Sequence, residues 1–110
     1  MKARFPKFDF SNLRAHWAPN WEFAQRANAA SLIPAYIEPY LLKVMMQAKK
    51  QIDPAKTALH SDLDIFIKQE MQHCRQHIAF NKRMHALGYE LLKPIEAEFD
   101  ATYTRFLATK

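Results

Sequence analysis

The sequence predicts an all-α protein, and three observations support this fold class. From residue 31 onward, apolar side chains recur at the three- to four-residue spacing of an amphipathic helix. Prolines and the single glycine fall where this pattern breaks, as expected at helix ends. The scarcity of glycine among 110 residues argues against a β-sandwich or barrel, which needs many turns. We therefore expect two long antiparallel helices, a shorter third helix and an irregular N-terminal leader.

Residues 1–30 form the predicted leader, which Pro6 and Pro19 keep irregular or only briefly helical. Asn20 has the side chain of an N-cap and predicts a short helix after it. The leader interleaves basic and aromatic residues, a pattern that can bind single-stranded nucleic acid. Because the basic residues are scattered along it, we expect the leader to pack over the core instead, and we expect no nucleic-acid partner.

Residues 31–110 form the predicted helical domain. Its first helix begins with Ser31 as N-cap, is kinked at Pro39 and ends near Lys50. The second helix begins at the Asp53-Pro54 pair or at Ser61. It ends at Gly88, where a residue with positive φ is favoured. The third helix begins at Lys93-Pro94 and continues to the end of the sequence.

Composition excludes several classes of protein. Hydrophobic residues make up 49% of the chain and charged residues 25%, which is typical of a globular domain and not of a disordered one. No apolar run approaches the roughly 18 residues of a membrane span, and the N-terminus lacks the apolar stretch of a signal peptide. The single cysteine, Cys74, cannot form an internal disulfide and is expected to be a small buried hydrophobe. These features predict a cytoplasmic protein that does not engage a membrane.

The second helix places polar residues in the middle of its apolar face. On a projection of about 100° per residue, one stripe contains the expected core residues Leu59, Leu63, Phe66 and Met84. The same stripe contains four polar side chains within an arc of about 80°: Glu70, His73, His77 and Asn81. A buried ionisable group is costly unless something compensates its charge. A bound metal ion would provide that compensation.

The spacing of these residues supports a metal site. Glu70 and His73 form Glu-x-x-His, which puts a carboxylate and an imidazole one turn apart, and His77 lies one further turn along. In the first helix, Glu38 is the one acid of an otherwise apolar segment. We expect Glu38, Glu70 and His73 to be ligands and His77 to be either a ligand or a partner that orients one. Asn81 is expected to be a buried polar residue that supports this group without binding the metal, and we assign no catalytic residue.

The remaining histidines, His16, His60 and His85, belong to no such group in the sequence. We expect them at the surface or at its boundary.

Two longer patterns carry a family resemblance. One reads F-I-x-Q-E-x-x-H-x-x-x-H-x-x-F-N and runs from Phe66 to Asn81. The other places Asn28 and Ser31 before Pro34 and Glu38. Both resemble a bacterial family of predicted metal-dependent hydrolases with a ferritin-like helical bundle. The resemblance covers nearly all of this chain but about half of the family domain, its N-terminal half.

This resemblance implies half of a ferritin-like bundle, with Glu38, Glu70 and His73 at the metal-binding positions of one half-site and His77 close by. It implies a metal-dependent hydrolase that uses a metal-activated water as nucleophile and iron, manganese or zinc as cofactor. One alternative is a di-iron carboxylate oxidase or iron-handling protein, since the same ligands suit iron. Another is a truncated helical association domain without catalysis. Because a di-metal bundle takes ligands from four helices, we expect a homodimer or a missing C-terminal half as partner.

Overall fold

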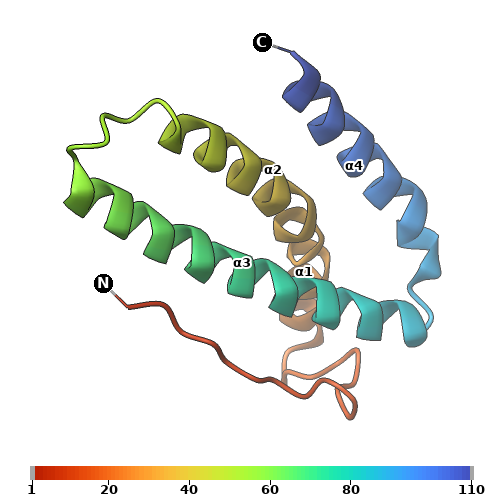
Figure 1. The fold of residues 1–110 in the computed structure, drawn as a ribbon. Coiled ribbons are helices and arrows are strands. Elements are labelled where there is room, and N and C mark those ends of the chain that lie inside the picture. The colour runs from red at the N-terminus through yellow and green to blue at the C-terminus, as the bar shows by residue number, and fades with distance from the viewer. Residues whose placement is uncertain (1, 110) are drawn as a thin grey trace.

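The computed structural model describes residues 2–109, so Met1 of the predicted leader and Lys110 of the predicted helical domain lie outside the described residues. Within this range the protein is all-helical, as predicted (Figure 1). Its elements are α1 (Trp21–Ala30), α2 (Leu32–Lys49), α3 (Thr57–Ala86), a 3-10 turn (Glu90–Leu92) and α4 (Lys93–Ala108). No helix in the described part combines the length and hydrophobicity needed to cross a bilayer.

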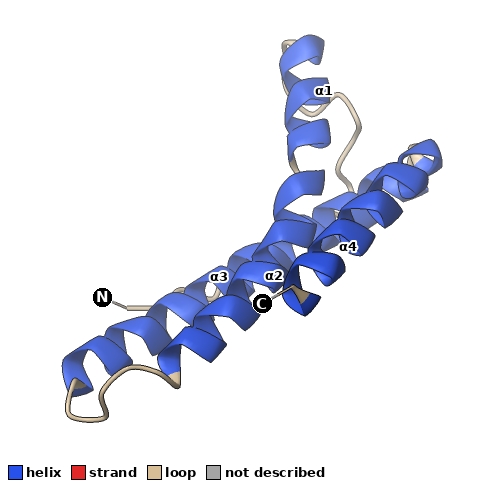
Figure 2. Cartoon of the chain, turned by 90° about the horizontal axis from the view of Figure 1, so that it is seen from above, coloured by secondary structure: helices blue, strands red, loops and turns tan. Residues whose placement is uncertain are grey.

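Three of the helices form a flat layer with α2 in the middle. α2 packs against α3 on one side and α4 on the other, and α2 and α3 run antiparallel (Figure 1). α1 projects away from this layer, as the view from above shows (Figure 2). The principal extents of the described chain are 50 × 32 × 20 Å. One layer of helices has little interior, so few hydrophobic residues are buried: Ala24, Leu32, Ala35, Ile67, Cys74 and Met84.

The leader follows α3 and then turns into α1. The Arg4 backbone N–H donates to Gln69 Oε1 at 2.7 Å, and further along α3 Arg83 Nε donates to the Leu13 carbonyl at 2.9 Å. The last third of the predicted leader is helical, because it forms α1. Asn20 caps this helix as predicted, since its Oδ1 accepts the Phe23 backbone N–H at 2.9 Å.

The start of α2 differs from the prediction. Ser31 precedes the helix, but its backbone is helical and its side chain makes no capping hydrogen bond. The reason is that α1 runs almost directly into α2. The Ser31 N–H donates to the Ala27 carbonyl at 3.0 Å, so Ser31 keeps a helical backbone and not the extended one of an N-cap residue. α2 then continues through Pro39 to Lys49, although proline removes one backbone donor from its interior.

The start of α3 was also predicted wrongly, whereas its end is confirmed. The helix begins at Thr57 instead of at Asp53-Pro54 or Ser61. Asp53 Oδ1 accepts the Ala55 N–H at 2.9 Å, which stabilises a turn before the helix instead of capping it. At the other end, Gly88 has a φ of 105°, as expected for the residue that follows a helix.

The core stripe of α3 differs in part from the prediction. Met84 and Cys74 are buried as expected, but Leu59 is 51% exposed and Phe66 is 40% exposed. Both residues lie in the N-terminal half of α3, which α1 and most of the leader do not cover. The prediction assumed a helix covered along its whole length, and a single layer does not provide that cover.

Candidate metal centre

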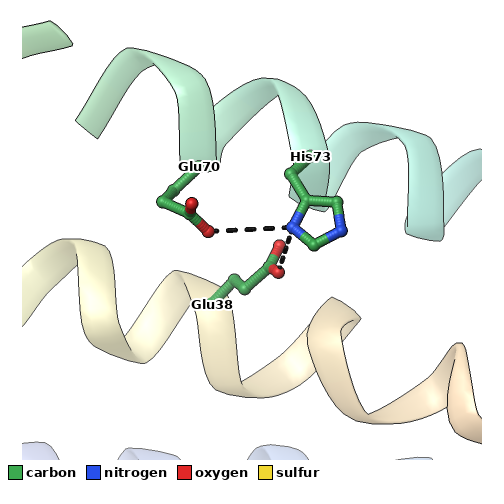
Figure 3. A group of neighbouring side chains, drawn as sticks. All are labelled: Glu38, Glu70 and His73. Atoms are coloured by element: carbon green, nitrogen blue, oxygen red, sulfur yellow. Dashed lines mark ion pairs between the residues drawn. The ribbon is translucent and has the colours of Figure 1, made fainter. Parts of the chain in front are cut away.

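Two antiparallel helices bring the predicted ligands together. Glu38 projects from the middle of α2 toward α3, and Glu70 and His73 project from consecutive turns of α3 toward α2 (Figure 3). One ligand atom from each of these three residues lies within 4.8 Å of the other two. His73 Nδ1 is 2.6 Å from Glu38 Oε1 and 3.7 Å from Glu70 Oε2. The Glu-x-x-His spacing and the lone acid of α2 therefore meet at one point, which we call the Glu38 cluster.

Glu38 is the buried member of the cluster. It is 6% exposed, and its Oε2 is a buried oxygen without a hydrogen-bond partner among the described residues. Burial, as the largest effect, raises the pKa of the Glu38 carboxyl above its ordinary value, although the neighbouring His73 acts against this rise. A buried carboxylate oxygen with no donor is unfavourable unless a cation or another donor reaches it.

The other two members are accessible. The His73 side chain is 49% exposed, and Glu70 is partly exposed. A cavity of about 280 Å³ lies beside the cluster and is lined by Glu38, Leu41, Met45, Phe66 and Glu70. Both carboxylates therefore face a small space whose other walls are apolar, and this space can admit a water molecule or a small substrate group.

His77 lies behind His73 instead of within the cluster. The two Nε2 atoms are 2.9 Å apart, and His77 Nδ1 is 2.8 Å from Ser31 Oγ. Asn81 continues the connection, because its Nδ2 donates to the Ser31 carbonyl at 3.0 Å. A chain of polar contacts thus runs from Glu38 through both histidines to Ser31 and Asn81, at the junction of α1 and α2.

The surroundings of His77 favour its neutral form. Burial is the largest cause that lowers the pKa of this imidazole below its ordinary value, and the positive charge that His73 can carry lowers it further. A neutral imidazole keeps one ring nitrogen as an acceptor and the other as a donor, so it can receive a proton from one neighbour while donating one to the other.

Comparison with known proteins identifies the family. A family described as "Predicted metal-dependent hydrolase" matches the chain over residues 2–110. The chain belongs to this family. No curated protein and no solved structure matches the chain. Membership of a metal-dependent family and the Glu38 cluster together indicate a divalent metal.

In this member of the metal-dependent hydrolase family, sequence reasoning missed Ser31 as a partner of His77. The expected role of Ser31 was that of a helix cap, yet its hydroxyl contacts a residue 46 positions away. Its place in the Asn28–Ser31–Pro34–Glu38 pattern was the one available signal of a role in the site.

A second polar cluster was also missed. His85, expected to lie apart from any group, is 2.7 Å from Glu96 Oε2 through its Nε2, and the Tyr36 hydroxyl donates to Glu96 Oε1 at 3.1 Å. Little in the sequence indicates this group, since its three members lie on three different helices.

Proposed function

We propose that Glu38, Glu70 and His73 bind a divalent transition metal and that the protein is a metal-dependent hydrolase. The observation that supports this most strongly is the unpartnered Glu38 Oε2, a buried carboxylate oxygen next to a second carboxylate and an imidazole. Two carboxylates with one histidine suit iron, manganese or zinc. When bound, such an ion supplies hydrolytic chemistry, because it lowers the pKa of a coordinated water molecule to near neutral.

The protein's own hydrogen bonds would hold His73 in the ligating tautomer. A His73 ring that ligates through Nδ1 carries its proton on Nε2, which faces His77 Nε2 at 2.9 Å. His77 must then carry its own proton on Nδ1 and donate it to Ser31 Oγ, 2.8 Å away. In this arrangement both nitrogens of His77 are engaged, so we propose that His77 orients His73 and is not itself a ligand.

The accessible side of the cluster is where we propose that hydrolysis takes place. Glu38 is held inside the protein, whereas the half-exposed His73 leaves the approach to the ligand atoms open. The cavity beside the two carboxylates can position a substrate group against Leu41, Met45 and Phe66. Glu70, which is not fully buried, lines this cavity and so brings a proposed ligand to its wall.

Metal content tests the proposed site. Protein prepared without chelators and reconstituted with Fe²⁺, Mn²⁺ or Zn²⁺ is expected to retain metal in elemental analysis. Glu70→Gln combined with His73→Ala removes two ligands and is expected to abolish this retention. The matched control is Glu98→Gln, which changes an exposed carboxylate on α4. Equal metal content in the double variant and the control would contradict the site.

A di-iron oxidase or iron-handling protein is the second candidate, because the oxygen-rich ligand set also suits iron. Aerobic addition of Fe²⁺ separates the two candidates. An absorbance band that develops only with oxygen favours iron chemistry, whereas hydrolysis of ester or amide substrates without such a band favours the hydrolase.

We also propose that the Glu38 cluster is half of a ferritin-like di-metal site and that a second copy of the chain supplies the other half. In such bundles four helices contribute ligands, whereas the cluster takes its ligands from two helices, α2 and α3. The exposed apolar side chains beside the cluster, Leu41 and Phe66, support this pairing because an isologous contact would cover them.

A further inference from the structure

α4 buries a carboxylate against the other helices. Glu96 is 7% exposed and is the one buried residue of α4. Its two oxygens have separate partners, His85 Nε2 at 2.7 Å and the Tyr36 hydroxyl at 3.1 Å. Burial and the nearby charge of Glu96 raise the pKa of Tyr36 to about 12, so the phenol remains a donor. Both oxygens of the buried Glu96 carboxylate therefore have a polar partner within the protein.

A cavity of about 470 Å³ adjoins this group, and residues of α2, α3 and α4 line it. Its volume lies within the range of small-molecule sites in proteins. Its polar lining consists of Tyr36, His85 and Glu96 together with Asn81, Lys82 and Lys93. None of the three residues of the Glu38 cluster lines it.

Asn81 lines this cavity and has a buried acceptor without a partner among the described residues. The residue is 4% exposed, its Nδ2 donates to the Ser31 carbonyl, and its Oδ1 is buried without a hydrogen-bond partner in the described part of the chain. Buried carbonyl oxygens are nearly always paired, so one that lacks a partner points to a missing donor. An N–H or O–H group of a ligand in the cavity would satisfy it.

The charges at the cavity wall favour an anion. Lys82 and Lys93 contribute two ammonium groups, while the carboxylate of Glu96 is already paired with His85 and Tyr36. Lys93 also donates to Glu90 Oε1 at 3.0 Å, but this pair is exposed and therefore weakly held. The cavity wall thus offers the ammonium groups of Lys82 and Lys93 as donors and Asn81 Oδ1 as a buried acceptor.

We propose that this cavity binds a small organic carboxylate that also carries an N–H or O–H donor. Its carboxylate would face Lys82 and Lys93, and its donor would reach Asn81 Oδ1. The site is separate from the proposed metal centre, because the ligand would contact none of Glu38, Glu70 and His73.

Three matched probes test whether the cavity recognises the carboxylate and whether it recognises the N–H donor. Each probe is titrated into the full chain, and binding is followed in amide NMR spectra. N-acetylglycine carries the carboxylate and the N–H. N-acetylsarcosine keeps the charge but lacks the N–H, and N-acetylglycinamide keeps the N–H but lacks the negative charge. We expect saturable shifts in the signals of Asn81 and His85 with N-acetylglycine, and binding at least about fivefold weaker with either of the other probes.

Variants at the surface keep the test independent of folding. The double variant Lys82→Ala with Lys93→Ala is expected to weaken N-acetylglycine binding by roughly fivefold. Lys50→Ala, at the far end of α2, is the matched control and is expected to bind like the unmodified chain. Equal binding of N-acetylglycine and N-acetylsarcosine, unchanged binding in the double variant, or no saturable shift would each overturn the proposal. A water molecule bound to Asn81 Oδ1 would then explain the unpaired oxygen.

Discussion

Ser31 connects the local structure of the chain to the Glu38 cluster. The Ser31 side chain makes no capping hydrogen bond, and its hydroxyl lies 2.8 Å from His77 Nδ1. Its carbonyl accepts from Asn81, so one residue anchors two polar side chains of α3. In the proposed site, His77 therefore orients His73, and Ser31 orients His77.

Ser31→Ala is therefore expected to weaken metal binding although Ser31 touches no proposed ligand. Loss of the hydroxyl frees His77 Nδ1 and leaves the His73 tautomer less well fixed, which typically lowers metal affinity about 10- to 100-fold. Titration calorimetry with Mn²⁺ measures this change. Ser61→Ala, an exposed serine of α3, is the control. An affinity equal to that of the control would show that the Ser31 hydroxyl has no part in holding the site.

His77 itself is expected to titrate below its ordinary pKa of 6.5 in the metal-free protein. Burial disfavours its charged form, so the unfolded chain takes up this proton first as the pH falls. The contribution of the neutral ring to folding stability is complete above pH 6.5 and is lost as the pH drops through the lower folded-state value. Imidazole NMR shifts, assigned with His77→Gln, measure the midpoint, and a midpoint at or above 6.5 would contradict the expectation.

At the scale of elements, different kinds of contact join α2 to its two neighbouring helices. α2 and α3 carry the Glu38 cluster and are also joined by the Lys49–Asp64 ion pair near their connecting loop. α4 packs on α2 through aromatic pairs such as Tyr36–Phe99 and Tyr40–Tyr103. The turn after α3 determines the direction in which α4 leaves, and Gly88 forms that turn.

Gly88→Ala is expected to lower the free energy of unfolding by about 1–2 kcal/mol, because a side chain disfavours a positive φ. A Cβ at this position would meet nothing within 4 Å, so the cost arises from the backbone alone. Gly88→Asn is expected to cost less, since asparagine tolerates positive φ better. Urea unfolding of the two variants measures both changes, and an alanine variant as stable as the unmodified chain would contradict the argument.

At the scale of the whole molecule, the flat layer leaves large apolar side chains in contact with solvent. Leu41, Leu59 and Phe66 are each at least 40% exposed, and two of them adjoin the proposed metal ligands. Such an exposed apolar patch is what the proposed pairing of two chains requires.

Sedimentation velocity is therefore expected to reveal a discrete dimer that added Mn²⁺ strengthens. Phe66→Glu places a charge in the proposed interface and is expected to shift the protein toward monomer. Phe5→Glu makes the same change at an exposed leader residue and is the matched control. A monomer at micromolar concentration that still binds metal tightly would rule out the paired half-site.

The sequence by itself determined the features that depend on spacing within one helix. The period of three to four residues predicted the helices, and Glu-x-x-His placed Glu70 and His73 on one face because a turn of helix has a fixed geometry. Glu38 was identifiable because an acid in an apolar helix needs a partner. These inferences required no knowledge of which helices touch.

The tertiary structure alone decided which helices lie side by side and how much of each is covered. It brought Ser31 to His77 and placed Tyr36, His85 and Glu96 together, although these residues are far apart in the chain. It also left Leu59 and Phe66 exposed in a stripe that the sequence predicted to be core. The physical reason is that periodicity describes one helix surface, whereas contacts between helices depend on how whole surfaces pack against each other.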